Sequence, residues 1–206
     1  MRTALTRILA LAGPLLTVPA AAQEMPRLFP TRDVAVRYTA SAPGQTAQPV
    51  EAAWLAARQR WRIETPRAPG WVLLDVPAQR AQMVMEGQRM VVTLPGRGQI
   101  PLLDGLPEGA KVSRAGSARV AGHDCALWRI VSKEGNGTAC LTPDGVLLRA
   151  SGEREGRRGS LEAEEVRYAP LNAARFEVPP GLMALNLPQG LSGLGQALPG
   201  LLPGGR

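Results

Sequence analysis

Hydrophobic and polar residues alternate along much of the chain with the period of two that is typical of half-buried β-strands. Between residues 58 and 64, for example, Trp61 and Ile63 alternate with Arg60 and Arg62. Segments of this kind, or of continuous apolar character, predict strands at residues 34–39, 59–64, 71–76, 82–85, 89–94, 126–132, 138–141, 146–150 and 161–168. Residues 51–57 are rich in helix formers, but we expect a strand there because the alternation runs straight on from them.

Turn-forming residues separate most of these segments. Pro143-Asp144-Gly145 is a strong turn signal, because proline presets the first turn position and glycine accepts a positive φ. Residues 95–109 and the charged stretch 152–159 are expected to be loops. Since no stretch before residue 186 shows sustained helical periodicity, the pattern predicts a mainly β, antiparallel fold.

The N-terminus has the features of a signal peptide. Arg2 and Arg7 precede an apolar run over residues 8–18, and a small-residue pattern ends at Ala22. The run is about half of the ~20 residues that a membrane anchor needs. We therefore expect cleavage between Ala22 and Gln23, removal of residues 1–22, and a periplasmic or secreted protein that does not span the membrane.

Composition divides the rest of the chain into one β-rich domain, residues 23–185, and a tail, residues 186–206. The tail is rich in Leu, Gly and Pro, and we expect it to be disordered, although its leucines fall at helical spacing. The net charge is +7, almost all of it from scattered arginines. Scattered charge on an exported protein argues against nucleic-acid binding, while a weak attraction to anionic surfaces stays open.

Cys125 and Cys140 are the two cysteines, and an even number in an exported chain predicts a disulfide. A zinc site is a poor alternative, because the chain's one histidine is His123. A hairpin turning symmetrically about Gly135 would leave Cys140 about 16 Å from Cys125, whereas a disulfide needs Cα atoms within about 7 Å. Either the turn is centred nearer to Ser132 and Lys133, or Cys125 lies where the chain bends; we expect the shifted turn.

No catalytic centre is predicted. His123-Asp124-Cys125 suggests a thiol nucleophile, but a disulfide-bonded Cys125 has no thiolate. Alternation places Glu162 and Glu164 on one face of a strand, with Glu165 on the other, so a solvated face explains them better than an acid–base pair. The sequence also lacks the Gly-x-Ser-x-Gly elbow, nucleotide-binding glycine loops and calcium loops. We expect no enzyme activity, no metal and no cofactor.

Several predicted strands are apolar on both faces, which has two interpretations. They could be buried on both sides, or they could belong to a concave sheet that lines a cavity for an apolar ligand, with methionine side chains giving adaptability. On the second interpretation the candidates for an apolar groove are Trp61, Trp71, Leu73, Met83, Met85, Met90 and Val92.

The chain resembles the exported bacterial family known as domain of unknown function 4412. The matching segments are residues 58–64, 75–90, 121–125, 139–146 and 176–181. More distantly, it is similar to the lipoprotein-carrier fold of the periplasm. That resemblance implies a strongly curved open sheet, or half-barrel, with at most short helices and an apolar groove. It implies no catalytic residues.

Two functions are consistent with these observations. The first is a periplasmic binding protein that holds lipid or another apolar ligand on the concave face of the sheet. The second is a protein-interaction module of the envelope with a dry core and no small ligand. A groove lined by Trp and Met would favour the first, and a filled interior would favour the second. The leucines of the tail could also lie in such a groove and become ordered there.

Overall fold

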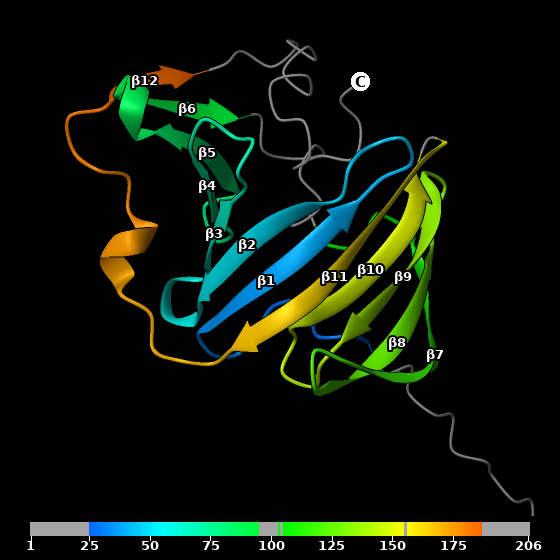
Figure 1. Ribbon diagram of the computed structural model, residues 1–206. Helices are drawn as coiled ribbons and strands as arrows, with labels where there is room; N and C mark the ends of the chain where they lie inside the picture. The colour runs from blue at the N-terminus through cyan, green and yellow to red at the C-terminus, as the bar shows by residue number, and fades with distance from the viewer. Residues whose placement is uncertain (1–24, 95–102, 104, 155, 187–206) are drawn as a thin grey trace, which may run out of the picture.

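The computed structural model describes residues 25–94, 103, 105–154 and 156–186. They form one twelve-stranded sheet that curves strongly and stays open (Figure 1). The strands are β1 (Val34–Ser41), β2 (Gln48–Leu55), β3 (Arg60–Glu64), β4 (Trp71–Asp75), β5 (Arg80–Met85), β6 (Met90–Leu94), β7 (Lys111–Val120), β8 (His123–Val131), β9 (Gly135–Leu141), β10 (Leu147–Arg154), β11 (Arg157–Arg167) and β12 (Met183–Asn186). The predicted mainly β, curved, open fold is confirmed.

The strand order across the sheet is β12-β6-β5-β4-β3-β2-β1-β11-β10-β9-β8-β7. Every neighbouring pair is antiparallel except β12 and β6, which are parallel. The described residues also include three short 3-10 helices, namely η1 (Ala56–Arg58), η2 (Glu86–Gln88) and η3 (Ala173–Phe176). None of the helices in the described part of the chain is long and apolar enough to cross a bilayer.

The expected strand at residues 51–57 is present as far as Leu55, and the chain then reverses through η1. Gln59 takes the left-handed conformation that ends the turn, with φ of 50°. As a result Trp54 lies directly opposite Trp61 in the β2–β3 pair. Trp54 and Trp61 share a face although an odd number of positions separates them, so the period of two changes phase at the turn and does not run straight on as expected.

The β8–β9 hairpin has the shifted turn that the cysteines require. Val131 pairs with Asn136, so the hairpin is centred between Lys133 and Glu134, close to the expected position. Cys125 and Cys140 form a disulfide with a Cα–Cα distance of 5.3 Å. The predicted bridge is therefore present.

Three elements differ from the sequence-based expectation. β7 was not predicted, because this edge strand is exposed at most positions and has no regular apolar face. Most of residues 152–159 are not a loop, since β10 extends to Arg154 and β11 begins at Arg157. β12 was not predicted either; it ends at Asn186, and the rest of the predicted tail lies outside the described residues, as does the predicted signal peptide.

Residues from most strands of the curved sheet contribute to one apolar interior. The main core cluster joins Val34, Trp54 and Leu74 from the middle of the sheet to Cys125 and Cys140 near its β7 end. A second cluster lies on the opposite face of β2–β6, where residues 171–182 cover it, and Phe176 is fully buried there. A third, smaller cluster surrounds Trp128.

Candidate binding surface on the concave face

The structure divides the seven predicted groove residues between two faces of the sheet. Trp61, Met83, Met85 and Val92 belong to or pack on the main cluster, and Met90 shares their face because it pairs with Met85. Trp71 and Leu73 lie on the opposite face, buried in the second cluster.

The expectation of one common stripe is thus corrected for Trp71 and Leu73. In β4 it is Val72 and Leu74 that share the face of Met83. β4 is buried at all five positions, as the alternative interpretation of a strand covered on both sides proposes.

Five apolar residues form a continuous shelf at the β12 edge of the concave face. We call this surface the methionine shelf; it consists of Met85, Met90, Val92, Met183 and Leu185. The sheet register aligns Met85, Met90 and Met183 in one row, and Val92 with Leu185 in the next. Met83 pairs with Val92 and so lies on the same face, further from the β12 edge. Four of the six methionines of the chain therefore lie on this face.

Exposure increases along the shelf toward the edge of the sheet. Met83 is 4% exposed, Met85 and Met90 are half-buried, Met183 is 65% exposed and Leu185 is 40% exposed. Large apolar side chains grouped in this way mark binding surfaces more often than scattered ones do. Sequence reasoning missed Met183 and Leu185, although their alternation with Ala184 just before the tail was a weak strand signal.

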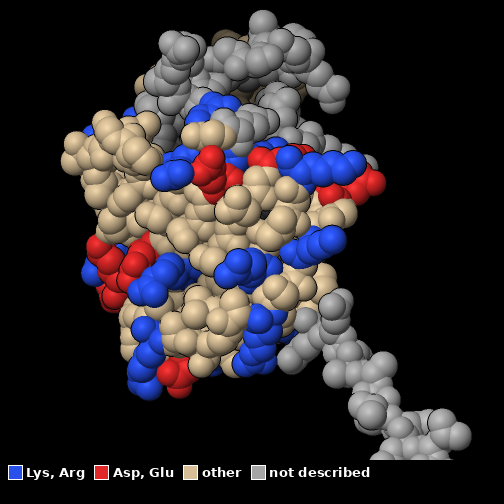
Figure 2. Space-filling model, turned by 90° about the vertical axis from the view of Figure 1, so that its right-hand side faces the viewer, with Lys and Arg blue, Asp and Glu red and all other residues tan. Residues whose placement is uncertain are grey.

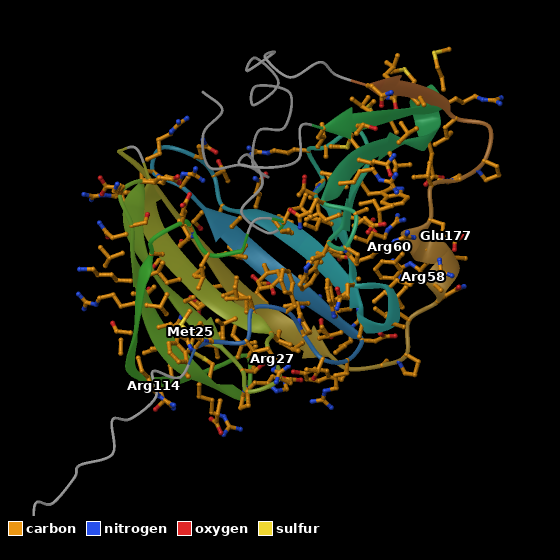
Figure 3. All side chains as sticks on the ribbon, turned by 180° about the vertical axis from the view of Figure 1, so that it is seen from behind. Met25, Arg27, Arg58, Arg60, Arg114 and Glu177 are labelled. Atoms are coloured by element: carbon orange, nitrogen blue, oxygen red, sulfur yellow. A yellow bond between two sulfur atoms is a disulfide. The ribbon has the colours of Figure 1, made fainter. Side chains whose placement is uncertain are left out.

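The N-terminal arm, residues 25–33, crosses the concave side of the sheet, which faces the viewer in Figure 3. The Phe29 ring stacks on Trp54 at 5.6 Å between ring centroids, and Trp54 contacts Trp61 at 4.9 Å. Trp54 Nε1 donates a hydrogen bond to the carbonyl oxygen of Pro30. Trp61 Nε1 is buried without a hydrogen-bond partner among the described residues. The deep part of the concave face is therefore filled by the chain itself.

A cluster around Asp144 holds the end of the arm. The Asp144 carboxylate accepts hydrogen bonds from Arg32 Nε at 3.0 Å, Thr142 Oγ1 at 2.6 Å and Tyr168 OH at 3.2 Å. Partial burial acts to raise the pKa of this carboxyl, but the hydrogen bonds outweigh it and lower the pKa below its usual value. The Arg32 guanidinium also lies 3.7 Å from the centroid of the Tyr168 ring.

Arginines on the outer face of the sheet hold the C-terminal strap, residues 171–182 (Figure 3). Arg62 donates to the carbonyl oxygen of Arg175, Arg60 donates to that of Phe176, and Arg58 binds the Glu177 carboxylate. Arg60 also pairs with Asp75, whose side chain is 8% exposed. These contacts position the strap, and β12 follows from it.

The residues considered for catalysis have structural partners. Cys125 is disulfide-bonded, and the His123 ring packs edge-on against Tyr168 at 5.8 Å. Glu162 pairs with Arg149, and Glu164 with Arg37. In the described ranges, no group of three or more His, Cys, Asp or Glu is placed to hold a metal ion.

Figure 2 shows the side of the molecule that faces right in Figure 1, where β7–β10 lie. Lysine and arginine side chains there are separated by uncharged residues, and acidic side chains lie beside several of them. Exposed ion pairs on and beside these strands include Arg154 of β10 with Glu134 of the β8–β9 turn, and Arg158 of β11 with Glu153 of β10. On this face, the arrangement differs from the continuous basic patch that is typical of nucleic-acid binding.

No protein-family model matches the sequence, and no curated protein matches it either. Membership in domain of unknown function 4412 therefore stays a prediction. A putative outer membrane lipoprotein-sorting protein domain from Vibrio parahaemolyticus aligns with 73% of this chain and 92% of its own, at 11% identity and a TM-score of 0.41.

Two solved structures are more similar. An uncharacterized conserved protein from Thermus thermophilus aligns with a TM-score of 0.55 and 11% identity, covering 76% of this chain and 91% of that one. A chain in the Pseudomonas aeruginosa MucA/MucB complex aligns with a TM-score of 0.50 and 14% identity, covering 77% of this chain and 62% of that one. This chain thus spans less than two thirds of the latter, and the two likenesses show that it shares their fold.

Proposed function

We propose that this chain is a non-catalytic binding protein of the bacterial cell envelope that holds an apolar ligand, such as one acyl chain of a lipid, on the methionine shelf. The observation that carries the proposal is the shelf itself, a contiguous, increasingly exposed apolar surface on the concave face. The expected signal peptide supports the envelope location.

The shelf is suited to an apolar ligand of variable shape. Methionine side chains are unbranched and polarizable, so they adjust to irregular apolar surfaces. Because Phe29, Trp54 and Trp61 already fill the deep part of the concave face, the ligand would lie along the rim formed by β5, β6 and β12.

Charge substitutions on the two faces of β12 test the proposal. The double variant Met183→Glu/Leu185→Glu places carboxylates on the shelf, whereas Ala184→Glu places one on the opposite face of the same strand, where Ala184 is also exposed. We expect the double variant to bind the fluorescent apolar probe N-phenyl-1-naphthylamine at least tenfold more weakly than wild type, and Ala184→Glu to bind it as wild type does. Equal probe affinity in all three proteins would contradict the proposal.

A second candidate function is a protein-interaction module, as in the alternative drawn from the sequence. The filled interior around Trp54 favours it, and so does the likeness to a chain of the MucA/MucB complex. The two functions differ in whether the protein binds an apolar small molecule. If wild type purified from its own periplasm shows no bound lipid by native mass spectrometry and binds no apolar probe, the second function is favoured.

A further inference from the structure

The N-terminal arm contacts the domain as a separate peptide ligand would. The arm precedes β1 and forms no strand with the sheet. It is held by side-chain contacts and by a backbone hydrogen bond from Thr31 N to the Asp144 carbonyl oxygen at 3.0 Å. Its outer end is open to solvent, since Met25 is 60% exposed.

We propose that the arm occupies a peptide-recognition site, and that this site also accepts an extended segment of another protein that carries an aromatic residue and an arginine three positions later. We call this the arm site and define it by Trp54, Thr142, Asp144 and Tyr168. It lies apart from the methionine shelf and does not depend on the function proposed for the shelf.

The first part of the site recognises an aromatic side chain. The Phe29 ring is stacked on Trp54 with an interplanar angle of 18°, and Trp54 is only 1% exposed. Trp54 Nε1 donates to the carbonyl oxygen of the next residue, Pro30, at 2.8 Å. A stacked ring with a hydrogen bond to the adjacent carbonyl favours an aromatic side chain and orients the backbone.

The second part recognises arginine. Arg32 Nε donates to Asp144 at 3.0 Å while the guanidinium plane covers the Tyr168 ring at 3.7 Å. A planar, delocalised cation can make both contacts at once, and a lysine ammonium would make them less well. The Asp144 side chain is 22% exposed, and a segment that displaces the arm and carries an arginine would keep this carboxylate in an ion pair.

The arm does not fill all the space beside it. An open hollow of about 340 Å³ adjoins the arm and the β2–β3 turn, lined by residues 27–31 together with Trp54, Ala56 and Gln59. A bulkier partner segment would have this hollow available beside the arm site.

Competition with the arm sets the conditions for binding. A tethered segment acts at an effective concentration of roughly millimolar, so the arm keeps the site closed to weak ligands. A partner must bind better than the arm, or the arm must be weakened. The Phe29→Ala/Arg32→Ala variant of the full chain removes both specific contacts and leaves Trp54, Asp144 and Tyr168 in place.

The test uses a fluorescein-labelled peptide with the sequence of residues 25–33, measured by fluorescence anisotropy. We expect the double variant to bind the peptide at least tenfold more tightly than wild type or the arm control Met25→Ala. The single variant Arg32→Ala, which keeps Phe29 on Trp54, should give an intermediate affinity. A peptide with both Phe and Arg replaced by Ala should not bind.

Further controls separate this site from the shelf. Circular dichroism and the absence of free thiols establish that each variant is folded. Adding Met183→Glu/Leu185→Glu should leave peptide affinity unchanged, whereas adding Asp144→Asn should weaken it. A folded double variant that binds the arm peptide no more tightly than wild type does, or that binds the Ala-substituted peptide equally well, would overturn the proposal.

Discussion

At the scale of single residues, the Asp144 side chain joins three segments that are far apart in the sequence, and no sequence motif indicated this. Its side chain joins the arm, the β9–β10 turn and the end of β11, through Arg32, Thr142 and Tyr168. The turn itself requires Gly145, which has φ of 94° and where a Cβ would lie 2.3 Å from the Phe29 carbonyl oxygen. The Pro143-Asp144-Gly145 signal therefore predicted the turn, but not the segment that packs on it.

The lowered pKa of Asp144 predicts how its contribution to stability depends on pH. A carboxyl whose pKa is lower in the folded than in the unfolded state stabilises the fold above the unfolded pKa, which is about 3.9. That contribution is lost as the pH falls through the folded pKa. We expect Asp144→Asn to lower the free energy of unfolding by about 1–2 kcal/mol at pH 7.

Urea denaturation of both proteins between pH 7 and pH 2 checks this expectation. The difference between wild type and Asp144→Asn should be constant above about pH 5 and should shrink as the pH falls below about 4. A difference that grows toward acid pH would show that the carboxylate destabilises the fold.

At the scale of elements, the outward residues of β3 and the preceding turn explain how a segment without strand character is held on the sheet. Arg58, Arg60 and Arg62 contact successive residues of the strap, Glu177, Phe176 and Arg175. Phe176 fills the second cluster beneath them. The alternation over residues 59–64 predicted a half-buried strand, and in the structure the arginine face of this strand binds the strap.

Arg60 and Arg58 should contribute different amounts to the free energy of unfolding, because their ion pairs differ in exposure. Arg60→Ala leaves the Asp75 carboxylate, 8% exposed, with the longer 3.8 Å contact to Arg80 as its remaining ion pair within the described part of the chain. Loss of one partner of a buried pair costs about 3 kcal/mol. Arg58→Ala removes an exposed pair and should cost less than about 1 kcal/mol. Urea midpoints measure both, and equal losses would contradict this assignment.

Alternation predicted most strands, because a half-buried strand separates its apolar and polar residues by face. It did not predict β7, which as an edge strand buries little, or β12, whose four residues are all exposed. Nor does alternation give the register between neighbouring strands. Met83 pairs with Val72 rather than with Trp71 or Leu73, so part of the predicted groove lies on the other face.

At the scale of the whole molecule, curvature decides which apolar surfaces are core and which remain available. In the middle of the sheet the concave face is closed by the arm, with Trp54 and Trp61 beneath it. At the β12 edge the same face is uncovered enough to leave Met183 and Leu185 exposed. One continuous apolar face thus provides both a core and a candidate binding surface. The sequence alone did not predict which of its residues belong to each.

The Cys125–Cys140 disulfide stabilises the β7–β9 end of this sheet. Both cysteines are buried in the main cluster and are separated by 15 residues. In the chain-entropy model, a loop of this size contributes about 3 kcal/mol. Because β8 and β9 are also joined by a hydrogen-bonded ladder, reduction should lower the melting temperature and leave the β-sheet spectrum intact. Melting curves with and without dithiothreitol measure the effect, and two reactive thiols in the exported protein before reduction would refute it.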